Sequence, residues 1–178
     1  MKINNAERAI LDTIRKRYLR TIDTKPVNTI TIIESAIMTI EMYNRNFVWR
    51  SIEYVFLFLY STKYVFTKKF DNLSIGRYQL KISCILDYLN IKYLLAYREI
   101  TLENARVFPI LKVFLNRNTS EVLAFLITSE KFKITQFTNI NSTEVRFFIE
   151  EYSRTLSTDI GFSYYFVFMN TVNQDQDI

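Results

Sequence analysis

Apolar residues recur along most of the chain at the three- and four-residue spacing of amphipathic helices. The first such segment runs from about Asn5 to Ile22, and Ile10, Leu11 and Ile14 share its predicted inner face. A second, buried helix is predicted by isoleucines at the same spacing, with Thr31 and Glu34 at capping-box separation near its start. These isoleucines are Ile30, Ile33, Ile37 and Ile40.

Further helices are predicted along the rest of the sequence. Residues from about 46 to 66 are too densely apolar for one narrow face, so this helix is expected in the core. Residues 71–76 break the pattern, and Ser74 is a suitable N-cap for a helix that continues to Leu89. Later helices are predicted at 101–115, where Pro109 should kink or divide the helix, and at 121–132, 143–156 and 162–172.

The pattern therefore predicts a mainly α fold. Residues 133–137 do not decide between the two periods, so at most a small β element is expected there. We find no internal repeat and no linker, which predicts a single compact multi-helix domain over residues 1–178. The polar residues 173–178 are expected to form a frayed tail.

The amino-acid composition excludes several classes of catalytic and metal-binding site. The chain has no histidine, which excludes Ser-His-Asp and Cys-His catalysis and most zinc sites. No metal-ligand cluster, Walker loop or dinucleotide fingerprint occurs, so no cofactor or metal is expected. Cys84 is the single cysteine and lies among apolar residues, which predicts a buried, inert thiol and no intramolecular disulfide.

The charges indicate compartment and partners. The net charge is +5, but aromatic residues are spread along the whole chain, so nucleic acid is not an expected partner. Residues 1–20 are charged throughout and lack the apolar core of a secretory signal. The longest strongly apolar run, 54–60, is well short of a membrane span. We expect a soluble protein that is synthesised in the cytoplasm without a signal peptide.

Glu41 is the leading candidate for a catalytic group. On a helix it lies beside the apolar stripe that contains Ile37 and Ile40. Such surroundings raise the pKa of a carboxyl because they disfavour its anion, as a general acid requires. The alternative is a helix-flank carboxylate that pairs with Arg45 at i+4.

Two motifs resemble those of the lysozyme-like superfamily. They are Ile40-Glu41-Met42-Tyr43-Asn44-Arg45 and Ser74-Ile75-Gly76-Arg77-Tyr78-Gln79-Leu80. Phe148-Ile149-Glu150-Glu151-Tyr152-Ser153 is a fainter third match, which departs at Ser153, where the family usually has Asn. The second motif also resembles, more distantly, the donor-site motif of peptidoglycan glycosyltransferases.

The resemblance to lytic transglycosylases and goose-type lysozymes implies a lysozyme-like core over about residues 30–172. It implies that Glu41 is the general acid, that Ser74, Gly76 and Gln79 shape a saccharide cleft, and that Tyr152 helps to close it. The expected substrate is peptidoglycan, in a bacterial or phage-like context, reached only if the protein is delivered to the cell wall, with or without a partner protein.

Hydrolysis with inversion needs a second carboxylate across the cleft, for which Asp71 and Glu53 are the candidates. Glu53 has a simpler interpretation as the i+3 partner of Arg50. A second hypothesis for the whole chain also stays open. It is a non-catalytic helical interaction protein, such as an immunity, adaptor or defence-complex subunit.

Overall fold

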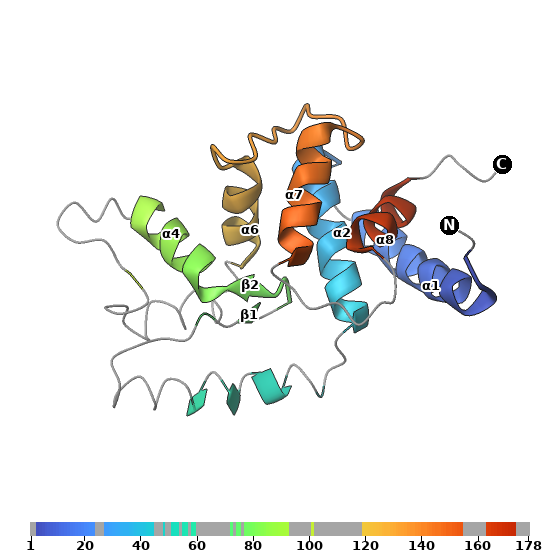
Figure 1. Ribbon diagram of the computed structural model, residues 1–178, viewed down its shortest axis with the longest axis horizontal. Helices are drawn as coiled ribbons and strands as arrows, with labels where there is room; N and C mark the ends of the chain where they lie inside the picture. Colours follow the sequence, from blue (N-terminus) through green and yellow to red (C-terminus); the bar gives the residue numbers. More distant parts are fainter. Residues whose placement is uncertain are drawn as a thin grey trace. The chain divides into compact units, whose positions relative to one another are not determined.

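The fold is described from a computed structural model (Figure 1). It describes residues 3–23, 27–44, 48, 51–53, 55–56, 58–59, 72, 74–75, 77–92, 101, 119–154 and 163–173. The protein is mainly helical, as predicted. The chain divides into two compact units, one formed by Met1–Asn44 with Ile127–Ile178 and the other by Arg45–Leu126. The predictions for 101–115, Pro109 and the tail 174–178 lie outside the described residues, apart from Thr101.

The first unit begins with helix α1 (Asn5–Ile22), whose predicted bounds are confirmed. Asn4 is its N-cap, and a reciprocal pair of 2.9 Å hydrogen bonds with Glu7 forms a capping box. Ile14 is fully buried, whereas Ile10 is only half-buried, so the inner face is rotated from the predicted one. The buried residues of α1 are Leu11, Ile14, Tyr18 and Ile22.

Helix α2 (Thr29–Asn44) contains the predicted isoleucine stripe. Ile33, Ile37 and Ile40 are fully buried, and Ile30 is half-buried. The predicted capping box of Thr31 with Glu34 is wrong. The helix begins two residues before Thr31, and the side chain of Asn28 accepts the Thr31 backbone N–H at 2.9 Å.

Helices α7 (Thr143–Arg154) and α8 (Tyr164–Val172) complete the first unit. Helix α8 packs against α1, α2 and α7, which places its fully buried Phe168 and Val167 in the core (Figure 1). The sequence predicted the N-terminal residue of each helix to within two residues. Each described helix of this unit buries apolar side chains, and their burial against one another stabilises the arrangement.

Residues 133–137, where at most a small β element was expected, form no strand and end in a turn. Lys133 has a positive φ of 55°, which interrupts an extended strand. The next residues fold back locally, since the Thr138 backbone N–H donates to the Thr135 carbonyl oxygen at 3.0 Å. The preceding helix α6 (Thr119–Thr128) begins and ends earlier than the predicted 121–132.

In the second unit, the described β structure is a short hairpin. Strands β1 (Ser74–Ile75) and β2 (Leu80–Lys81) are antiparallel, with Ser74 opposite Lys81. Ser74 is therefore not the N-cap of a helix, and that prediction is wrong. Helix α4 (Ile82–Lys92) begins only after the hairpin, and the side chain of Asn72 accepts the Ser83 backbone N–H at 3.0 Å.

The described residues between 48 and 59 are helical, as predicted, but they do not lie in the core. Val48, Val55, Phe56, Phe58 and Leu59 are each more than half exposed. Dense apolar sequence therefore misled the prediction of burial. No helix within the described part of the chain is long and apolar enough to cross a membrane.

Candidate functional site

Glu41 lies in the last turn of α2 and is buried, with 2% of its surface exposed. Its neighbours Ile37 and Ile40 are fully buried, so Glu41 lies beside the apolar stripe, as predicted. The carboxyl therefore belongs to the interior of the first unit and not to an exposed helix flank. The proposed alternative pairing with Arg45 lies outside the described residues.

Two tyrosines share the surroundings of Glu41. Tyr164, the first residue of α8, has its hydroxyl in the buried interior, and this burial raises its pKa well above 10. The negative charge of the neighbouring Glu41 carboxylate raises that pKa further. The Tyr164 hydroxyl thus keeps its proton and lies near the carboxyl group of Glu41, without a hydrogen-bond partner among the described residues.

Tyr152 extends this cluster from α7. Its ring centroid lies 6.1 Å from that of Tyr164 and 5.8 Å from that of Phe148, and only 5% of its surface is exposed. Tyr152 also raises the pKa of Tyr164. The structure thus brings together Glu41 and Tyr152, which the resemblance singled out, around a third residue that the sequence did not.

Tyr164 was missed because it had no motif of its own. The sequence predicted the helix that contains it, and its place at the first turn follows from Ser163 as the N-cap. Nothing in the spacing of apolar residues distinguishes Tyr164 from Tyr165, the next residue of α8. Its place beside Glu41 and Tyr152 follows only from the packing of α8 against α2 and α7.

Gln79 and Glu53 meet in the second unit. The side-chain amide of Gln79 donates to both carboxylate oxygens of Glu53, each at 3.0 Å. Gln79 is 2% exposed and has a positive φ of 50° in the turn that joins β1 to β2. A residue predicted to bind saccharide and a candidate second carboxylate are therefore hydrogen-bonded to each other.

The other predicted cleft residues are less informative. Ser74 is half-buried in β1 and pairs with Lys81 across the hairpin. Gly76 and Asp71 lie outside the described residues. Glu41 and Gln79 belong to different units, so the expectation that they face one cleft stays a prediction.

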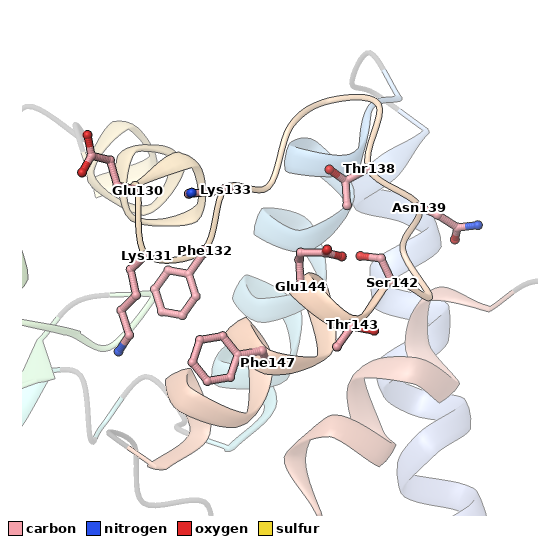
Figure 2. Close-up of a pocket in the computed structure, with 10 residues that line it drawn as sticks. All are labelled: Glu130, Lys131, Phe132, Lys133, Thr138, Asn139, Ser142, Thr143, Glu144 and Phe147. Carbon is pink, nitrogen blue, oxygen red and sulfur yellow. The ribbon is translucent and has the colours of Figure 1, made fainter.

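A pocket of about 780 Å³ lies elsewhere in the first unit, between the α6–α7 loop and the start of α7 (Figure 2). Figure 2 shows the rings of Phe132 and Phe147 close together beside it, and their centroids are 5.6 Å apart. Its charged lining residues have mixed sign, and Glu41 and Tyr152 are not among the lining residues. The charged ones are Glu130, Lys131, Lys133 and Glu144.

Metal and thiol chemistry find little support in the described residues. No group of three or more His, Cys, Asp or Glu side chains within those residues is arranged to hold a metal ion. Cys84 is half-buried in α4, and burial together with the charge of Asp87 raises the pKa of its thiol. A thiol with a raised pKa is a poor nucleophile at neutral pH.

Comparisons with protein-family models, curated proteins and solved structures give no match for this chain.

Proposed function

We propose that this protein cleaves the glycan strands of peptidoglycan, as a muramidase or lytic transglycosylase, with Glu41 as the general acid. The observation that carries the proposal is the buried cluster of Glu41, Tyr152 and Tyr164. Glu41 and Tyr152 come from separate motifs of one resemblance, and both neighbour Tyr164. Catalytic carboxyl groups commonly occupy such apolar surroundings, because burial favours the neutral acid.

The chemistry assigned to the cluster is proton transfer. Glu41 gives its proton to the glycosidic oxygen as the bond from that oxygen to the sugar C1 breaks, and the oxocarbenium-like centre is trapped by the substrate. Where the C6 hydroxyl traps it, the Glu41 carboxylate takes the hydroxyl proton back, so the acid is restored. Tyr164 keeps its own proton and stays neutral beside the Glu41 carboxyl, because burial raises its pKa well above 10.

A mechanism with one protein carboxylate fits the described residues better than inverting hydrolysis. Inversion needs a second carboxylate that activates water. Glu53 has both carboxylate oxygens bound by Gln79, and a base in that role has to release this hydrogen bond first. The lytic route avoids that requirement, since the nucleophile belongs to the substrate.

The direct test is incubation of the purified chain with isolated cell-wall sacculi, followed by chromatography of soluble products. We expect release of muropeptides, with 1,6-anhydro ends if the lytic route operates. Heat-denatured protein serves as the control for contaminating activity. Absence of released muropeptides at high protein concentration would contradict the proposal.

The second candidate function is a non-catalytic helical interaction protein. The observation that favours it is the low exposure of Glu41, together with its absence from the lining of the described pocket. In that case the buried carboxyl stabilises the packing of α2 against α8 and does not meet a substrate. The sacculus assay separates the two functions, because a binding protein releases no fragments.

A further inference from the structure

Among the described residues, the most exposed large apolar side chain is that of Phe137, with 86% of its surface exposed. It lies in a tight turn, Thr135–Thr138, which we call the Phe137 turn. The residue before this turn, Ile134, is 1% exposed and anchors the chain in the core of the first unit. Single exposed apolar side chains are common, so what distinguishes Phe137 is the turn that holds it.

Hydrogen bonds hold the Phe137 turn on both sides of the ring. The Thr138 backbone N–H donates to the Thr135 carbonyl oxygen at 3.0 Å, and the Thr135 backbone N–H donates to the Thr138 hydroxyl oxygen at 2.9 Å. The turn is also tied to the first residue of α2, because the Thr29 hydroxyl donates to the carbonyl oxygens of Gln136 and Thr138, at 3.0 and 2.5 Å. Since the backbone is already fixed, little entropy is lost when a ligand contacts the ring.

The loop that contains the turn is uncharged. Residues 134–143 include no acidic or basic side chain, and Lys133 and Glu144 border them with opposite signs. The loop has exposed side-chain amides, which both donate and accept hydrogen bonds. These amides belong to Gln136, Asn139 and Asn141. Figure 2 shows the Asn139 amide pointing away from the pocket. Phe137 is therefore an apolar ring within a neutral, hydrogen-bonding surface.

We propose that the Phe137 turn is a docking site for one sugar unit of a neutral glycan strand. The C–H face of the sugar stacks on the Phe137 ring, and its hydroxyl groups form hydrogen bonds with the Gln136 and Asn139 amides. One aromatic ring matches one sugar in size, whereas a protein partner needs an apolar core of several side chains. The uncharged loop offers no attraction to anionic lipid headgroups or to nucleic-acid phosphates.

The docking site is separate from Glu41. Thr29, which holds the turn, and Glu41 both belong to α2, and their backbones lie about 18 Å apart along its axis. Docking and cleavage can therefore be lost independently. That the strand is peptidoglycan rests on the proposed function, whereas the stacking and hydrogen bonding at the Phe137 turn do not depend on Glu41.

Co-sedimentation with purified cell-wall sacculi tests the docking site, in a Glu41→Gln background so that cleavage does not erode the strands. We expect binding that persists in about 0.5 M sodium chloride, since the contact is uncharged. The soluble β-1,4-linked tetramer of N-acetylglucosamine should compete with it. Phe137→Ser should weaken binding about tenfold, and Phe137→Tyr should retain it.

The matched control is Phe56→Ser, because Phe56 is also exposed, at 52%, but lies in the other unit. This control should bind sacculi as strongly as its parent. Circular dichroism shows whether each variant is folded, and the competition by the soluble tetramer does not depend on any variant at position 137.

Equal binding with and without the Phe137→Ser change would overturn the proposal, as would loss of binding in high salt. Self-association of the chain that Phe137→Ser abolishes would also overturn it, and would identify the turn as an interface between two copies. Failure of the proposed function gives a different pattern. The wild-type chain then binds sacculi through Phe137 but releases no muropeptides, which supports docking and contradicts glycan cleavage.

Discussion

Gln79 holds both carboxylate oxygens of Glu53, each at 3.0 Å, from a turn position with a positive φ. The sequence had suggested these two residues for separate roles in a saccharide cleft. Their pairing gives Gln79 a structural role within its own unit, because it orients the helical segment that contains Glu53. Because both carboxylate oxygens of Glu53 accept hydrogen bonds from Gln79, Glu53 has to release them before it can act as a base.

Replacing Gln79 by Ala should destabilise the protein by about 1.5–3 kcal/mol, the usual range for losing a hydrogen bond to a charged group. Alanine and glutamine face the same steric cost at a positive φ, so the substitution reports mainly the lost amide. Urea unfolding of the variant measures the change. In a Glu53→Ala background the same substitution should have little effect, and an undiminished effect there would show that the pair is not the cause.

Alkaline pH should destabilise the first unit through Tyr18. Burial raises the pKa of Tyr18 to about 12, whereas an unfolded tyrosine titrates near 10. Since the folded state retains this proton longer, the stabilising contribution is complete below pH 10 and is lost as the pH rises toward 12. The loss from one such group is at most about 1.4 kcal/mol per pH unit.

The comparison with Tyr18→Phe isolates this contribution, because Tyr88 and Tyr164 also have raised pKa values. Urea unfolding at several pH values between 9 and 12 gives the free energy of unfolding of each protein. The wild type should lose more stability than the variant over this range. Parallel curves would contradict the burial of the Tyr18 hydroxyl.

The packing of α8 predicts a large effect at Phe168. Its side chain is fully buried in a helix that packs against α1, α2 and α7, so Phe168→Ala should cost about 3–5 kcal/mol. Phe137→Ala is the matched control, since this phenylalanine is 86% exposed and should change stability by less than about 0.5 kcal/mol. Equal effects in thermal or urea unfolding would place α8 outside the core.

The parts of the fold that the sequence predicts well are those in which local signals agree. Helix α1 combines an apolar face with Asn4 and Glu7 at its start, so its bounds follow from the sequence alone. The predictions fail where a distant residue decides the local structure. Helix α4 begins next to the side chain of Asn72, eleven residues before the Ser83 N–H that it accepts.

The hairpin and the exposed helix were mispredicted for different reasons. Two-residue strands are too short to show the alternation of apolar and polar residues that predicts a strand. Glutamine is also not a residue type that predicts a positive φ, although Gln79 has one. In the 48–59 segment, apolar density indicates helix but does not distinguish a core from an outward face. At the candidate site, the sequence indicated Glu41 and Tyr152, while Tyr164 required the packing of three helices.

The most direct test of the account is glycan cleavage by Glu41→Gln. Glutamine nearly matches the shape of glutamic acid and still forms hydrogen bonds, but it has no acidic proton to give. Glu144→Gln is the control, since Glu144 is an exposed glutamate of the same unit. We predict that muropeptide release from sacculi is abolished in Glu41→Gln and unchanged in Glu144→Gln, while both retain wild-type circular dichroism. Cleavage by a folded Glu41→Gln variant at the wild-type rate would contradict the assignment of Glu41 as the general acid.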